Sequence, residues 1–124
     1  MQAMQVERRV LAWVLGVVVV AAMALGGCAG SEAPEVQVDD AGDADPVLVE
    51  GRELWTAQCS RCHGADGSGG AGPDVRGPWS SDRQPDATTM ATIIAEGRGA
   101  MPGFGGELSD DEIDAIVRYV REVL

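Results

Sequence analysis

In this chain of 124 residues, the stretch Cys59-Ser60-Arg61-Cys62-His63-Gly64 is the most informative about fold and function. It holds the only His of the sequence and two of its three Cys. On a helix, two residues three positions apart lie on the same face, about one turn from each other. The imidazole of His63 follows at once, so two thiols and one ring nitrogen can act together on a single bound group.

The spacing Cys-x-x-Cys-His is the attachment pattern of c-type haem. Each thiol can form a thioether with a haem vinyl group, and His63 can then reach the iron from below the macrocycle. Three other uses of the motif fit less well. A thioredoxin-like site would follow a strand in a βαβ unit, a zinc site would need a carboxylate as its fourth ligand, and a disulfide would leave His63 unexplained.

The second axial ligand of such a haem can be sought by elimination. The sequence has no Lys and no second His, which leaves a Met thioether or an open position. Met90 lies on the apolar face of a predicted helix, where Met usually fills the core. Met101 lies in the Gly-rich loop 97–104, where Gly allows close approach and Pro102 stiffens the chain. We therefore expect Met101 to be the ligand.

Three amphipathic helices are predicted around these residues, over about 47–59, 86–97 and 109–124. Asp86 is a candidate N-cap for the second helix and Gly97 its stop signal. Ser109-Asp110-Asp111-Glu112 is a capping box at the start of the third. Because the domain shows no convincing alternation of period two, we expect an all-α fold.

Composition narrows the possible functions. The net charge is −11, and all nine basic residues are Arg. Such a chain cannot neutralise a run of phosphates, so nucleic acid is an unsuitable partner, as is an anionic membrane surface. With 4% aromatic residues and 17 Gly, an unaided apolar core would be thin for one small domain. A covalently held haem would complete that core.

The first 27 residues are typical of an export signal, with Arg8 and Arg9 ahead of an uncharged apolar run. The run ends in Leu25-Gly26-Gly27-Cys28, which resembles a bacterial lipobox. That resemblance implies cleavage before Cys28, followed by lipidation of its thiol and its new amino group. The alternative is an uncleaved transmembrane helix. Both place the domain on the exported side of a bacterial membrane, which is the periplasmic side if there are two membranes.

Residues 29–46 hold six acidic residues and neither a basic nor an aromatic one. Such a segment buries too little apolar area to offset its ordering entropy, so a disordered tether is predicted. A flexible coil of this length has ends roughly 25 Å apart. The haem domain is therefore expected to begin at about residue 47 and to extend to Leu124.

From about Val47 to Leu124 the chain resembles a short bacterial class I cytochrome c. The resemblance rests on the haem motif and on four further groups of residues: Gly51-x-x-x-Trp55, Gly72-Pro73-Asp74-Val75-x-Gly77, Met101-Pro102-x-Phe104 and Tyr119. It implies three to four helices wrapped around the haem. One departure is Val75, which stands where the family usually has Leu.

The resemblance also implies roles for single residues. Gly51, Trp55 and Tyr119 match the residues at the crossing of the first and last helices. Pro73 matches a Pro whose carbonyl group binds the other ring nitrogen of the haem-ligating His. Trp79 matches an aromatic residue that contacts a haem propionate in some members.

A His/Met haem has no free position for a substrate, so we expect an electron carrier of a respiratory chain rather than an enzyme. Because of the charge, we expect redox-protein partners with neutral or basic docking faces. Two alternatives remain open. One is a haem enzyme or a gas or redox sensor with a labile sixth ligand, and the other is a fixed electron-entry subunit of a larger oxidoreductase.

Overall fold

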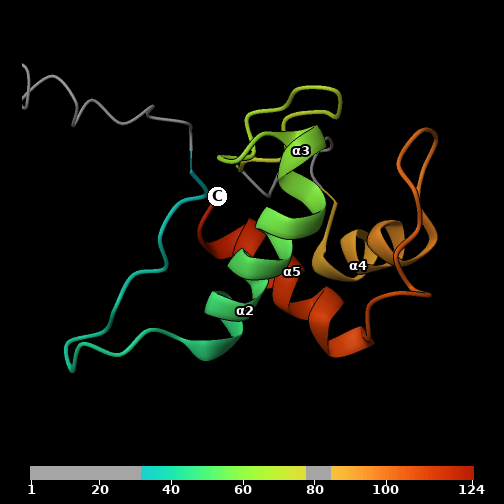
Figure 1. The fold of residues 1–124 in the computed structure, drawn as a ribbon. Helices are drawn as coiled ribbons and strands as arrows, with labels where there is room; N and C mark the ends of the chain where they lie inside the picture. Colours follow the sequence, from blue (N-terminus) through green and yellow to red (C-terminus); the bar gives the residue numbers. More distant parts are fainter. Residues whose placement is uncertain (1–31, 78–84) are drawn as a thin grey trace, which may run out of the picture. The chain divides into compact units, whose positions relative to one another are not determined.

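The computed structural model of the protein describes residues 32–77 and 85–124 (Figure 1). The helical segments in this part of the chain are α2 (Pro46–Leu54), η1 (Trp55–Cys59), α3 (Ser60–His63), α4 (Ala87–Glu96) and α5 (Asp110–Glu122). Because α2, η1 and α3 follow one another without a break, the described part has three helical arms. The predicted all-α fold is confirmed.

The helix boundaries follow the capping signals of the sequence. The carboxylate of Asp86 caps the first turn of α4, and α4 ends at Gly97, whose φ of 80° suits a residue without a Cβ. Both bonds of the predicted capping box between Ser109 and Glu112 are present at the start of α5. At α2, Asp45 is the N-cap, one position ahead of Pro46.

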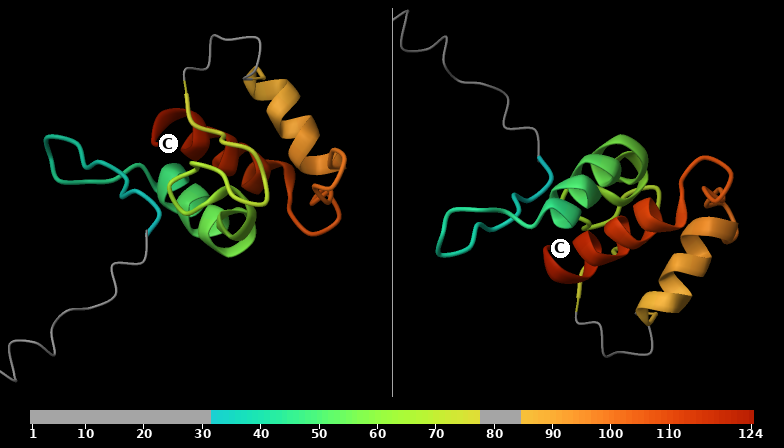
Figure 2. Two further views of the ribbon diagram at one scale, coloured as in Figure 1. Left: turned by 90° about the horizontal axis from the view of Figure 1, so that it is seen from above. Right: turned by 90° about the horizontal axis from the view of Figure 1, so that it is seen from below.

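The arms meet where α2 crosses α5, as both views of Figure 2 show. Gly51 lies at this crossing, and a Cβ placed there would overlap the Ala115 carbonyl group and come within 2.8 Å of the Tyr119 Cβ. Only Gly allows so close an approach. The rings of Trp55 and Tyr119 then pack beside the crossing, with their centroids 6.5 Å apart. These residues lie as the family resemblance implies.

The apolar face of α5 forms the centre of the core. Ile113, Ile116, Val117 and Val120 are each at most 3% exposed. From α4, Met90 and Ile94 pack against this face and are also buried. The predicted role of Met90 as a core residue is therefore confirmed.

Residues 33–36 lie on the helical domain, and we call them the N-terminal strap. Ala33 is only 6% exposed and belongs to the core cluster. The Arg52 guanidinium donates hydrogen bonds to the carbonyl groups of Ala33 and Pro34. The Tyr119 hydroxyl donates to the Pro34 carbonyl group over 2.7 Å.

These contacts differ from the disordered tether predicted for residues 29–46. In its described part the chain is fixed by the strap and then by a turn. In that turn the Asp39 carboxylate accepts hydrogen bonds from two backbone amides, and Val38 pairs with Ala44. Composition measures how little apolar area the segment can bury, but main-chain carbonyl groups serve as acceptors whatever the side chains are. The compact unit accordingly runs from Ser31 to Leu124.

Several predictions fall on residues that the structure does not describe. They are the export signal over residues 1–27, the lipidation site Cys28 and the propionate contact Trp79. Within the described ranges, no helix combines the length and apolar character needed to cross a membrane.

We expect Gly51→Ala to destabilise the folded haem protein by at least ~2 kcal/mol, because the added methyl group meets backbone rather than a movable side chain. Gly106→Ala is the matched control, since a Cβ there meets no atom within 4 Å. Thermal unfolding of the two variants measures the difference. Equal melting temperatures would contradict the close helix crossing.

Candidate haem-binding site

The two thiols of the motif lie at the end of the first helical arm. The backbone there widens into a π-helical turn, in which the Ser60 amide donates to the Trp55 carbonyl group five residues earlier. Such turns are frequent at functional sites. Cys59 is buried and Cys62 is exposed, and no disulfide joins them. Burial, with a smaller contribution from Cys62, raises the pKa of Cys59 to about 11, so this thiol is protonated at neutral pH.

His63 is held in one orientation by a main-chain acceptor. Its Nδ1 lies 2.9 Å from the Pro73 carbonyl oxygen. A carbonyl oxygen can only accept, so Nδ1 carries the proton and Nε2 keeps its lone pair. A hydrogen bond of this kind fixes the ring of a metal-ligating His and raises its basicity. The contact implied by the family resemblance is thus present.

The loop after α3 folds back over the motif and packs on the His63 ring. The Gly72 amide donates to the Cys62 carbonyl group over 2.7 Å. A Cβ at Gly72 would come within 2.8 Å of the imidazole. On the other side, the Trp55 and His63 ring centroids are 6.0 Å apart, and Trp55 Nε1 donates to the Ala65 carbonyl group.

An ion pair braces the same loop. The Arg76 side chain donates two hydrogen bonds to the Asp74 carboxylate, which also accepts from the Arg76 amide. Hydrogen bonding from Arg76 lowers the pKa of Asp74 to about 2. The carboxylate therefore keeps its charge at neutral pH, directly after the carbonyl group of Pro73 that holds the imidazole.

Met101 closes a tight turn in the loop between α4 and α5, which rises at the right of Figure 1. Arg98 and Met101 exchange two backbone hydrogen bonds of 3.1 Å each. Gly99 lies inside the turn with a φ of +63°. The Met101 side chain is partly buried and packs against the core cluster. The loop thus fixes the backbone at Met101.

The structure therefore brings Cys59, Cys62, His63 and Pro73 together as predicted, while Met101 comes from a separate loop. The sequence assigns no role to Gly72, although the imidazole of His63 occupies the space that a Cβ would need at this position. Its position directly before Pro73 is the only signal that could have indicated this role. The π-helical turn ahead of Cys59 has no signal in the sequence.

These side chains fit a covalently bound haem. Cys59 and Cys62 present unpaired thiols for two thioethers, and His63 presents Nε2 for the iron. Met101 offers a soft thioether from a rigid turn. When bound, the group would supply an iron that cycles between the ferrous and ferric states, with a potential that a thioether ligand and burial raise.

Comparisons with known proteins find relatives of this chain among the cytochromes. The family model described as "Cytochrome C oxidase, cbb3-type, subunit III" matches residues 46–120. Cytochrome c6 of Gracilaria tenuistipitata var. liui is 32% identical over 88 residues, which cover 68% of this chain and 77% of that protein.

Two longer proteins match over a part of their length. The cbb3-type cytochrome c oxidase subunit FixP of Azorhizobium caulinodans is 35% identical over 60% of this chain and 27% of its own. A solved structure, dihydro-haem d1 dehydrogenase NirN in complex with DHE, matches with a TM-score of 0.53 and 36% identity. It covers 60% of this chain and 16% of that one.

Proposed function

The chain belongs to the class I cytochrome c family, and from this we propose that it is a membrane-anchored monohaem electron carrier whose iron is bound by His63 and Met101. The family establishes the coarser statement, a c-type cytochrome that carries electrons and is not an enzyme. The observation that carries the ligation proposal is the 2.9 Å contact between His63 Nδ1 and the Pro73 carbonyl oxygen. It leaves Nε2 as the only ring nitrogen available to a metal.

Met101 is proposed as the sixth ligand because its loop is built to hold one position. The turn with Arg98 fixes the backbone at Met101, and Gly97 packs against the Met101 carbonyl group. Met90, the other Met of the domain, is buried in the core at 8% exposure. Of the two Met residues, Met90 therefore fills the core, and Met101 can bind the iron.

With both axial positions filled by side chains, the site has no place for a small-molecule substrate. Electrons would enter and leave near Cys62, the exposed thioether position. The protein would hold the His63 ring and the Met101 loop in place while the iron changes its oxidation state, so that the ligand geometry changes little. Trp79 stays proposed as a contact to a propionate.

We expect Met101→Ala to remove the absorption band of the thioether bound to ferric iron and to lower the reduction potential, because the softest ligand is lost. The reduced variant should bind carbon monoxide quickly. Met90→Leu is the matched control and should keep the band. If instead Met90→Leu removes the band and Met101→Ala keeps it, the assignment is reversed.

A second candidate function follows from the family model, whose description names an oxidase subunit. The domain would then be a fixed electron-entry subunit of a larger complex in place of a mobile carrier. Stoichiometric co-purification of partner subunits after mild solubilisation would favour this candidate over a free carrier.

We also propose that the protein is anchored on the exported side of the membrane through lipids on Cys28. The support is the order of charges, apolar run and Leu25-Gly26-Gly27-Cys28 in the sequence. Haem attachment at Cys59 and Cys62 requires the same export route. Two or more acyl chains give stable anchoring where one is marginal.

We expect mass spectrometry of the purified chain to show an amino terminus at Cys28 that carries acyl chains. The protein should remain with the membrane fraction at high salt, because its attachment is hydrophobic. A membrane-bound chain that still begins at Met1 would contradict lipidation and would favour the uncleaved transmembrane helix.

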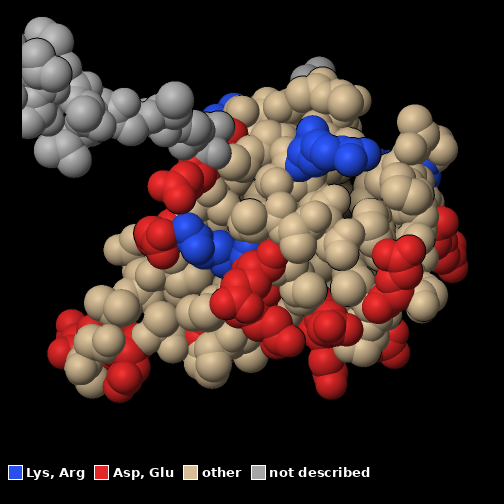
Figure 3. All heavy atoms as spheres, viewed as in Figure 1, with Lys and Arg blue, Asp and Glu red and all other residues tan. Residues whose placement is uncertain are grey.

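Its partners are proposed to be redox proteins with neutral or basic docking faces. The chain carries a net charge of −11, and in Figure 3 acidic side chains gather over α2 and below it. Arg61, exposed between the two thiols of the motif, opposes this field at the haem end. Long-range attraction would therefore favour cationic partners, while Arg61 weakens it locally.

Salt dependence of electron transfer tests the sign of this field. The rate with a cationic ruthenium ammine complex should fall as ionic strength rises, and the rate with ferricyanide should rise, because salt screens exposed charges. Arg61→Gln should speed the reaction with the cation. The opposite salt trends for the two reagents would show that the field at the haem end is positive.

A further inference from the structure

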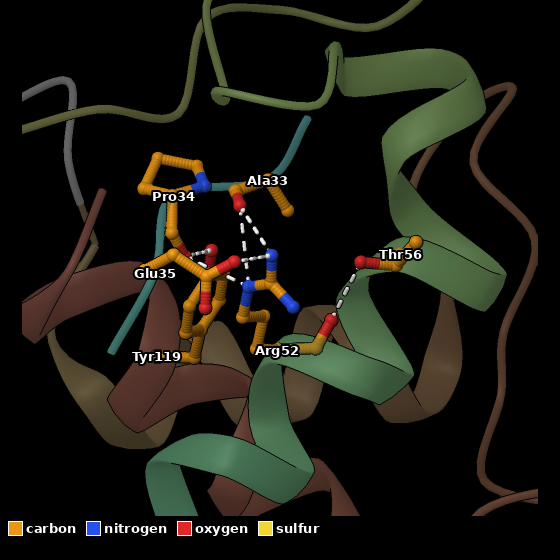
Figure 4. Close-up of polar contacts among 6 residues, drawn as sticks. All are labelled: Ala33, Pro34, Glu35, Arg52, Thr56 and Tyr119. Atoms are coloured by element: carbon orange, nitrogen blue, oxygen red, sulfur yellow. Dashed lines mark hydrogen bonds and ion pairs between the residues drawn. The ribbon is translucent and has the colours of Figure 1, made fainter. Parts of the chain in front are cut away.

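The N-terminal strap is held by polar contacts that reach it from two helices (Figure 4). From α2, the Arg52 guanidinium donates to the Ala33 carbonyl group over 2.9 and 3.2 Å and to the Pro34 carbonyl group over 3.1 Å. It also pairs with the Glu35 carboxylate at 2.6 Å. From α5, the Tyr119 hydroxyl donates to the Pro34 carbonyl group at 2.7 Å.

The contacts to the Ala33 and Pro34 carbonyl groups are partly shielded from water, whereas the Glu35 carboxylate is exposed. Ala33 and Tyr119 are both buried, and the Arg52 side chain is 25% exposed. A charged donor between main-chain carbonyl groups makes stronger hydrogen bonds than a neutral one. Losing the strap would break the hydrogen bonds from Arg52 and Tyr119 and would expose Ala33, which belongs to the core cluster. The strap is therefore a fixed part of the domain.

We propose that the strap shortens the link between the membrane anchor and the haem domain to residues 29–32, and thereby restricts the protein to redox partners in the same membrane. This inference rests on the proposed anchor at Cys28. From Cys28 to Ala33 the chain spans at most about 18 Å. A free tether reaching residue 47 could extend to about 68 Å.

The maximum length of the link can be compared with the diameter of the domain. A chain of this length folds to a body about 30 Å across. A link shorter than that diameter keeps the domain against the bilayer surface. The domain can then rotate and slide with its anchor, but it cannot reach a redox centre that lies well above the membrane.

The strap also lies close to the haem ligand. Tyr119, which binds the strap, packs 6.5 Å from Trp55, and Trp55 packs 6.0 Å from His63. Two ring-to-ring contacts thus separate the attachment point from the proposed haem. The haem should therefore stay near the membrane surface together with the strap. The matching partner is a membrane-bound redox protein whose cofactor lies close to the bilayer.

Energy transfer from a fluorescent lipid to the haem measures this height. The full-length, exported haem protein is bound to vesicles that contain a phospholipid with a fluorescent headgroup, and quenching of the lipid is recorded. A Gly/Ser insertion between Gly30 and Ser31 lengthens the link and leaves the strap intact. The double variant R52Q/Y119F removes the strap contacts from both helices. Arg121→Gln, which removes a hydrogen bond from an Arg of α5 to the main-chain carbonyl group of Pro85, is the matched control.

Wild type and Arg121→Gln should quench strongly. The insertion should lower the quenching, and R52Q/Y119F should lower it towards the level of the insertion variant with an unchanged haem spectrum. Amide hydrogen exchange over residues 32–45 should rise in R52Q/Y119F only. Equal quenching in wild type and R52Q/Y119F, or in wild type and the insertion variant, would overturn the proposal. The mass of the same wild-type preparation separates this failure from that of the anchor, because an unlipidated Cys28 contradicts the proposed function itself.

Discussion

The close crossing of α2 and α5 at Gly51 is the constraint on which the rest of the domain depends. A residue with a Cβ at this position would meet the Ala115 carbonyl group, so the two helices could not approach as they do. Their contact places Trp55 between Tyr119 and His63. It therefore fixes the direction in which the first arm continues through its π-helical turn into the Cys59–His63 motif.

At the end of that arm, the chain fixes the orientation and the tautomer of the His63 imidazole. The Pro73 carbonyl oxygen accepts a hydrogen bond from Nδ1–H of His63, and the backbone at Gly72 lies so close to the imidazole that a Cβ there would come within 2.8 Å of it. The arrangement needs no further side chain, because the acceptor is a main-chain carbonyl oxygen and the residue beside the ring is a Gly. Its benefit for an electron carrier is that the imidazole keeps one orientation while the iron changes its charge.

The sequence allowed the helices and the haem motif to be predicted because both depend on residues close together in the chain. Asp86, Gly97 and the capping box at Ser109 act within a turn or two, and the apolar stripe of α5 repeats with the helical period. The strap could not be predicted in this way. It depends on Arg52 and Tyr119, which lie 19 and 85 residues from their acceptors. The contact of Gly72 with His63 likewise depends on the path of a loop.

The absorption spectrum of the wild-type haem protein shows whether the sixth position of the iron is closed. The exported haem protein should show the absorption band of a thioether bound to ferric iron, and its reduced form should bind carbon monoxide only slowly. The band disappears and carbon monoxide binds fast if the sixth position is open. That result would contradict the electron-carrier account and favour a haem enzyme or a sensor.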